Sequence, residues 1–218
     1  VISYSWKTTV LSVYKLHMSK NGLTISLNEV LFYFTRAGFG VNASIGVSED
    51  FARSNIWIAQ NGFDPSECSL LALDNLDSQT SSLSIEFEKT GDGSHLFCPE
   101  DKVLSAIEAS VSCVDWLEFN GLDGDLKLTN VDSPLLVVSA LGANQCTGIQ
   151  VSWTDKSNNH YEVNLKDDIE WEIISSSEAP IELSNYADIH ISAFDVNNKT
   201  SISNGKLKTL NIAEERLK

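Results

Sequence analysis

The stretch from Ile25 to Asp64, ISLNEVLFYFTRAGFGVNASIGVSEDFARSNIWIAQNGFD, predicts two capped amphipathic helices joined by a glycine-rich bend. Ser26 and Glu29 form a capping-box pattern, in which each side chain accepts a hydrogen bond from the backbone N–H of the other residue. We expect the first helix to end at Gly38 and Gly40, because glycine is common just past a helix. The apolar face of this helix is predicted to contain Leu27, Val30, Leu31, Phe34 and Ala37.

The second helix is expected to open at Gly46-Val47-Ser48 and to stop at Gly62. Glu49 and Asp50 fall in its first turn, where the positive end of the helix dipole favours acids. The residues that recur at helical spacing, and that we expect to face the core, are Phe51, Ala52, Asn55, Ile56 and Ala59.

The remainder of the chain changes from helical to strand patterns after a third helix, which is expected to start at Asp64-Pro65 and to run to about Leu76. A further helical stretch is expected from Pro99 to about Val111, whereas the uniformly apolar run from Pro134 to Leu141 is compatible with a buried helix or a buried strand. Alternation and turn residues predict three hairpins, over 84–98, 116–128 and 149–165, and single strands at 169–174, 189–194 and 207–212.

Together these elements predict an α+β fold, with an N-terminal helical hairpin of two or three helices packed on a mostly antiparallel, hairpin-built β region. We expect one domain over residues 25–218, with a helical part at 25–76 and a mostly β part at 83–218. Residues 1–24 are expected to be an N-terminal extension. Either translation starts naturally at Met18, or the residues before it form a β-prone strand.

Composition limits the classes of partner that the chain can take. With 15 basic and 30 acidic residues its formal net charge is -15, and such a surface repels nucleic-acid phosphates and anionic lipids. We therefore expect neither nucleic-acid nor membrane binding. No two of the four cysteines are separated by two residues, the spacing of a zinc knuckle or a redox dithiol. They are typical of buried thiols in a reducing compartment, and we expect a cytoplasmic location.

The helix pair also resembles a functionally uncharacterised bacterial family, known only as a domain of unknown function. The likeness covers about a fifth of the chain. It rests on Ser26-Leu27-Asn28-Glu29-Val30, on Arg36-Ala37-Gly38 with Gly40, on Gly46 to Glu49, and on Ala52, Trp57 and Gly62. Looser likeness continues through Cys98-Pro99 and Pro134-Leu135-Leu136.

This chain departs from that family in two places. The first helix is bulky and aromatic at Leu31 to Phe34, where members of the family have a small, basic helix. The family also tends to end in a glycine- and alanine-rich tail, which would be expected to begin where this chain ends, at Lys218. The resemblance implies a fold-level neighbour and no reaction.

A group of polar residues on the two predicted helices is the candidate ligand-binding site. Brought together around the glycine bend, they would form a charged pocket able to hold a small polar ligand through a bidentate arginine. The alternative is that the acids cap their helices and the arginines form ordinary ion pairs. These residues are Asn28, Glu29, Arg36, Glu49 and Arg53.

Metal and cofactor signatures are weak in this sequence. His95, Cys98 and Asp101, with the distant Cys113, Cys146 and His160, lack the paired close spacing of a zinc site, so we expect no metal. The sequence contains no glycine-rich phosphate loop, nucleophile elbow, dinucleotide fingerprint or HExxH motif. We accordingly expect no cofactor and identify no catalytic residue.

The sequence therefore favours a non-enzymatic accessory or binding protein, acting by self-association or through a protein partner. Phe32 and Tyr33 are expected to lie off the buried stripe of the first helix and to form the interface, because exposed aromatic residues commonly mark one. The alternative is a small-molecule enzyme, with a pocket lined by Arg36, Glu49 and Arg53 and by Cys98 or Asp101. A structural module without any ligand is the third possibility. The sequence leaves enzymatic activity open.

Overall fold

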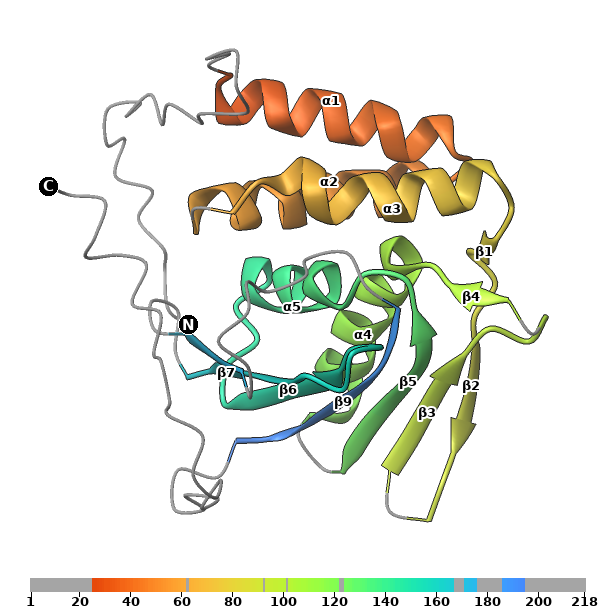
Figure 1. The fold of residues 1–218 in the computed structure, drawn as a ribbon, viewed down its shortest axis with the longest axis vertical. Coiled ribbons are helices and arrows are strands. Elements are labelled where there is room, and N and C mark those ends of the chain that lie inside the picture. Colours follow the sequence, from red (N-terminus) through yellow and green to blue (C-terminus); the bar gives the residue numbers. More distant parts are fainter. Residues whose placement is uncertain are drawn as a thin grey trace, which may run out of the picture.

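The computed structural model describes residues 25–61, 63–91, 93–100, 102–121, 124–166, 171–175 and 186–194. The predicted N-terminal extension, with its two interpretations, and the predicted strand at 207–212 lie outside these residues. Among the described residues, five helices and nine strands form a single fold with one mixed sheet (Figure 1).

Local capping signals account for the three N-terminal helices, α1 (Leu27–Gly40), α2 (Ile45–Gln60) and α3 (Pro65–Asp77). Ser26 and Glu29 form the predicted capping box of α1. The predicted start of α2 was wrong: its N-cap is Ser44, whose hydroxyl accepts from the Val47 N–H, so that Gly46 lies within the first turn. Asp64 caps α3, as Asp64-Pro65 predicts.

The nine strands are β1 (Ser81–Ser82), β2 (Glu86–Lys89), β3 (Gly93–Phe97), β4 (Val103–Leu104), β5 (Asp125–Val131), β6 (Ile149–Thr154), β7 (His160–Leu165), β8 (Trp171–Ser175) and β9 (Ala187–Ala193). Their order is β1-β4-β5-β9-β6-β7-β8, and β3 pairs with both β2 and β5. The hairpins β2–β3 and β6–β7 confirm two predictions. The expectation of a mostly antiparallel sheet is matched in part: five of the eight described pairings are antiparallel, but β1–β4, β3–β5 and β4–β5 pair in parallel, so the sheet is mixed.

The predicted hairpin over 116–128 was wrong. Residues 116–120 are the last turns of α4 (Ala106–Asn120), and β5 begins at Asp125. Trp116 and Leu117 are buried while Glu118 and Phe119 are exposed, which is the burial of a helix and not of a strand. Residues 103–104, which were predicted to belong to a helix starting at Pro99, form strand β4, and Ser105 caps α4.

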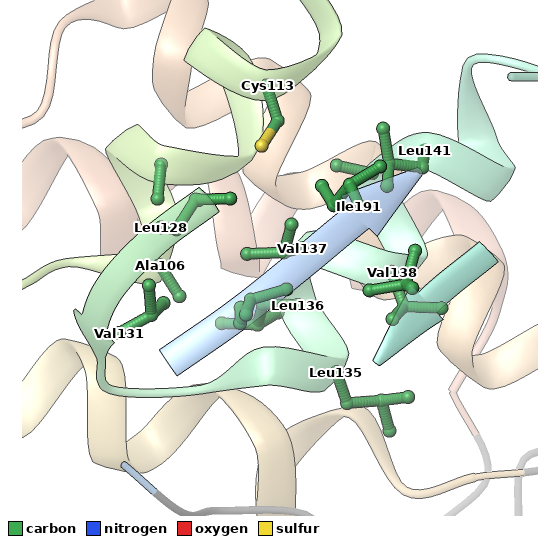
Figure 2. Close-up of a cluster of buried hydrophobic side chains, with 14 of the residues drawn as sticks. Ala106, Cys113, Leu128, Val131, Leu135, Leu136, Val137, Val138, Leu141 and Ile191 are labelled. Atoms are coloured by element: carbon green, nitrogen blue, oxygen red, sulfur yellow. The ribbon is translucent and has the colours of Figure 1, made fainter. Parts of the chain in front are cut away.

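The apolar run from Pro134 forms the central helix α5 (Pro134–Ala143). Its residues 134–141 are all buried, because strands, α4 and the N-terminal helices surround it. Figure 2 shows its leucine and valine side chains among Leu128 and Val131 of β5, Ile191 of β9 and Cys113 of α4. A helix buried on every side carries no amphipathic period, which is why periodicity could not distinguish it from a strand.

The helices are stacked on one another above the sheet (Figure 1). α2 contacts α4, α5 and α3, whereas the main contact of α1 is α2. The N-terminal helical hairpin therefore packs on the α4–α5 layer and not directly on the sheet, which corrects the sequence-based expectation. This arrangement makes α1 the outermost element, with one side against α2 and its other side exposed.

Candidate functional site

The predicted ligand-binding residues of α1 and α2 lie in exposed positions along their own helices. Glu29 accepts from the Ser26 N–H at 2.7 Å and from the Ser26 hydroxyl at 2.9 Å. Both bonds use Oε2 of Glu29, and they lower the pKa of this carboxyl. Glu29 therefore caps its own helix, as the alternative to a ligand-binding pocket predicts. Asn28 beside it is exposed.

The remaining residues of that set are held within single helices in the same way. Arg53 pairs with Asp50 and lies 3.8 Å from Glu49, all on α2. The guanidinium of Arg36 lies over the ring of Phe32, 5.0 Å from its centroid. None of the five predicted residues lines either of the two cavities described below. The structure does not bring them together, and ligand binding there stays a prediction.

The exposed side of α1 forms a surface that we call the α1 outer face, made by Glu29, Phe32, Tyr33, Arg36 and Phe39. Phe32 and Tyr33 are 51% and 57% exposed, as their position off the buried stripe predicts, and their rings meet edge to face with centroids 5.6 Å apart. Arg36 forms no ion pair among the described residues. Two aromatic rings and a guanidinium thus form one ordered exposed cluster.

A cleft lies at the carboxyl end of β5, where β6 ends and β9 begins, and its volume is about 500 Å³. We call it the sheet-edge cleft. Its position matches the place where open α/β sheets usually hold ligands. The residues that line it are Asn130, Ser152, Trp153, Thr154, Asp155, Lys156, His160, Tyr186, Ala187, Asp188 and His190.

The two carboxylates of the sheet-edge cleft already have partners. Asp155 accepts from the N–H groups of Ser157 and Asn159 and from the hydroxyl of Tyr161. Its burial raises the pKa of this carboxyl, but these hydrogen bonds outweigh that effect and the net pKa is lowered. Asp188 accepts from the Asn130 N–H at 2.9 Å and lies 3.5 Å from the Lys127 ammonium.

Lys156 is the cation of the cleft that lacks a carboxylate partner among the described residues. Its Nζ lies 4.4 Å from the ring centroid of Tyr186. His190, by contrast, lies 3.2 Å from Asp125. The lining thus combines two hydrogen-bonded carboxylates with a lysine that has no ionic partner in the described part of the chain.

A buried polar network connects this cleft to the N-terminus of α4. The Tyr186 hydroxyl donates to Oδ1 of Asn75 at 3.0 Å, and Nδ2 of Asn75 lies 3.5 Å from Asp132. Asp132 in turn accepts from the Ala106 N–H at 2.8 Å. The Ser81 hydroxyl lies beside this carboxyl but reaches full hydrogen-bond geometry with no described group. Burial raises the pKa of Asp132 to about 6, although these hydrogen bonds oppose the increase.

Asp132 is 0% exposed and directly follows the last residue of β5. Its own N–H donates to Leu104 at the end of β4, and its carboxylate caps α4. Asp132 therefore fixes the end of β5 against the β4–α4 junction. It is not among the residues that line the cleft. The sequence interpretation missed Asp132 because its partners, the Ala106 N–H and the Asn75 amide, are 26 and 57 residues away along the chain.

A second cavity, of about 110 Å³, lies between α2, α4 and α5. Asp50, Asp115 and Glu118 contribute acids to it, while Ser54 and Ser110 donate to backbone carbonyls within their own helices. These serines are therefore satisfied, and the described lining of this cavity contains acids but no basic residue.

The four cysteines differ in burial. All four are free thiols; Cys68 and Cys113 are buried, whereas Cys98 and Cys146 are half-buried. Burial raises the pKa of Cys68 to about 12 and that of Cys146 to about 11, which disfavours the reactive thiolate. Within the described ranges, no group of three histidine, cysteine or acidic residues is arranged to hold a metal ion.

Comparisons with known proteins show only distant similarity. No family model and no curated protein matches the chain. Among solved structures, a malate dehydrogenase from Pyrococcus horikoshii OT3 is similar at 9% identity and a TM-score of 0.49, with 73% of this chain and 52% of that chain covered. A malate dehydrogenase from Entamoeba histolytica gives 8% identity and a TM-score of 0.48, with 72% and 50% covered.

A sulfolactate dehydrogenase from Methanocaldococcus jannaschii gives 9% identity and a TM-score of 0.45, with 71% and 51% covered. This chain spans about half the length of the structures that it matches. At this level of similarity we take neither an activity nor a substrate from them. No helix in the described part of the chain is long and apolar enough to span a membrane.

Proposed function

We propose that this protein is a non-enzymatic accessory or binding protein that acts by association through the α1 outer face. The observation that carries the proposal is the concentration of exposed apolar side chains there. Three of the eight large hydrophobic residues exposed in the described part belong to this face, Phe32, Tyr33 and Phe39, and the exposed Leu31 and Ile45 are close to them in sequence. Contiguous exposed apolar surface of this kind marks interaction sites in folded proteins.

The position of α1 supports the same function. α1 packs through the buried Val30 and Gly38 and through Phe34, which contacts Phe51 of α2, whereas Phe32 and Tyr33 are exposed. An aromatic ring that remains half in water costs hydration free energy, which a partner would recover by covering it. Phe119 is 90% exposed but stands alone at the end of α4, and isolated exposed apolar residues are common.

Native mass spectrometry of the protein, isolated under mild conditions from the cells that make it, tests this proposal. We expect one discrete associated species, whether a second copy or another polypeptide, with the wild-type protein and with the control variant Phe119→Ser. The same species should be lost from Phe32→Ser/Tyr33→Ser. A bare wild-type monomer, or a double variant that keeps the species, would show that the α1 outer face is not an interface.

A second candidate function, binding of a small anionic ligand, is favoured by one observation in the sheet-edge cleft. Lys156 lies in a cleft whose two carboxylates are already hydrogen-bonded, and a cleft of about 500 Å³ is large enough for a metabolite carrying a carboxylate or a phosphate. We therefore propose the sheet-edge cleft, rather than the helix pair, as the site of this small-molecule alternative.

Chemical-shift titrations with inorganic phosphate and with succinate test this second candidate. We expect saturable shifts in the wild-type protein, and affinity about tenfold lower in Lys156→Gln, because the variant loses the ammonium. The control is Lys102→Gln, since Lys102 pairs with Glu100 outside the cleft at 2.8 Å. Identical titrations of the two variants would exclude Lys156 as the anion-binding group.

A further inference from the structure

We propose that the partner of the α1 outer face is a second copy of this chain, whose α1 packs antiparallel with Glu29 of each copy opposite Arg36 of the other. This inference rests on the proposed function. It starts from spacing: positions 29, 32, 33 and 36 are three, four and seven residues apart, so they share one side of the helix. The buried residues Val30 and Gly38 lie on the other side.

Antiparallel packing makes this face complementary to itself. If the twofold axis passes between positions 32 and 33, Phe32 lies opposite Tyr33 of the second copy, and residue 29 lies opposite residue 36. Both ends of the contact then hold an acid facing a base, on either side of a central aromatic cluster. A parallel pairing would instead place Glu29 against Glu29 and Arg36 against Arg36, and like charges repel.

The charged groups of the face are available for these pairs. Arg36 has no carboxylate partner in the described part, and its guanidinium is held at the surface by the ring of Phe32. Glu29 uses Oε2 for both bonds to Ser26, so Oε1 remains open to an arginine without loss of the capping box. Arginine is suited to such a contact because its planar fork matches a carboxylate.

Charge elsewhere on the molecule argues against other contacts between copies. The whole chain has a net charge of -15, so two copies repel over most of their surfaces. Helix α1 carries one acid and one base, Glu29 and Arg36, and is therefore neutral. Two copies can approach along α1 without that repulsion, whereas a strongly basic partner would find little acid there.

The size of the contact sets the expected strength. Helix α1 has 14 residues and is about 21 Å long, so one of its faces covers less than the roughly 800 Å² per partner of a standard stable interface. We therefore expect a reversible dimer with a dissociation constant on the order of micromolar. The ion pairs are exposed at the rim, where they determine orientation more than affinity.

A charge-swap experiment tests the orientation directly. In Arg36→Glu and in Glu29→Arg each homodimer would contain two like-charged contacts, and we expect self-association at least about tenfold weaker than that of the wild type. A mixture of the two variants restores an acid opposite a base at both ends. We expect this mixture to dimerise within about threefold of the wild type. The two variants differ in mass, so native mass spectrometry separates heterodimers from homodimers.

The control pair is Glu49→Arg and Arg53→Glu, which change the same residue types at exposed positions of α2. We expect these two variants to dimerise like the wild type, alone and when mixed. Circular dichroism melting checks that Glu29→Arg is folded. The Ser26 hydroxyl still accepts from the N–H of residue 29 in that variant, so half of the capping box is retained.

The outcomes separate this inference from the proposed function. If the wild-type protein is monomeric at every concentration, its partner is not a second copy of this chain. The proposed function is then decided by native mass spectrometry of the protein isolated from its own cells. A dimer that Phe32→Ser/Tyr33→Ser abolishes, but that mixing the charge variants does not restore, overturns the antiparallel pairing and leaves the proposed function standing. A dimer unaffected by either set of changes overturns both.

Discussion

Gly142 of α5 lies directly against the indole ring of Trp57 of α2. A Cβ atom at position 142 would lie 2.6 Å from both Nε1 and Cζ2 of that ring, closer than real Cβ contacts come. Glycine is therefore required at position 142, because α2 approaches the central helix α5 closely there and the Trp57 ring fills the space that a side chain would need. Trp57 is also the internal tryptophan on which the sequence resemblance partly rests.

Gly142→Ala should destabilise the protein by about 2 kcal/mol, although alanine is the better helix former, because the added methyl overpacks the contact with Trp57. Gly40→Ala is the matched control, since nothing lies within 4 Å of its added Cβ and it should stabilise α1 by about 0.5 kcal/mol. Urea unfolding of both variants measures this. If the two changes had equal effects on the free energy of unfolding, the claim of a rigid contact between Gly142 and Trp57 would be wrong.

Asp132 should make stability depend on pH in a defined direction. Its pKa is raised from 3.8 to about 6 in the folded protein, so the folded state retains a proton that the unfolded state has released. The contribution of this group to stability is therefore largest at low pH and falls as pH rises through about 6, by up to roughly 3 kcal/mol at 1.4 kcal/mol per pKa unit.

Asp132→Asn removes that titration and keeps an oxygen that can accept from the Ala106 N–H. The free energy of unfolding of the variant, relative to that of the wild type, should therefore rise between about pH 4 and about pH 7, a range that spans the unfolded pKa of 3.8 and the folded pKa of about 6. Denaturant unfolding at the two pH values measures it. A constant difference between the two proteins would show that the carboxyl of Asp132 titrates normally.

The thiols should react in an order set by burial. Cys98 is half-buried and should react first with Ellman's reagent, and Cys146 should follow more slowly because its pKa is raised to about 11. Cys68 and Cys113 are 0% exposed and should react only after unfolding. Mass spectrometry of partly labelled protein identifies the modified residues. Early labelling of Cys113 would mean that the core around α5 opens readily.

Local signals in the sequence were sufficient for part of this fold. The capping box of Ser26 and Glu29 and the Asp64-Pro65 start predicted α1 and α3, because helix ends depend on nearby side chains. The two confirmed hairpins have short loops, so their pairing is also local. The exposure of Phe32 and Tyr33 followed from the same helical periodicity.

Interactions between distant residues account for what the sequence did not predict. The parallel pairing of β3 with β5 joins segments separated by α4, and no local pattern specifies it. The hairpin at 116–128 was wrong because the short apolar-polar-apolar run Leu117-Glu118-Phe119, which resembles a strand, belongs to the last turns of a helix. The sheet-edge cleft and its buried network combine Asn75, Asp132, Lys156 and Tyr186, which only the tertiary fold brings together.

Sedimentation velocity of the purified wild-type protein and of Phe32→Ser/Tyr33→Ser, over concentrations from about 1 to about 200 µM, tests the central claim most directly. The wild-type sedimentation coefficient should rise with concentration from that of a monomer to that of a dimer, while the double variant should remain monomeric and folded. If the two proteins sediment alike at every concentration, the α1 outer face does not join copies of this chain.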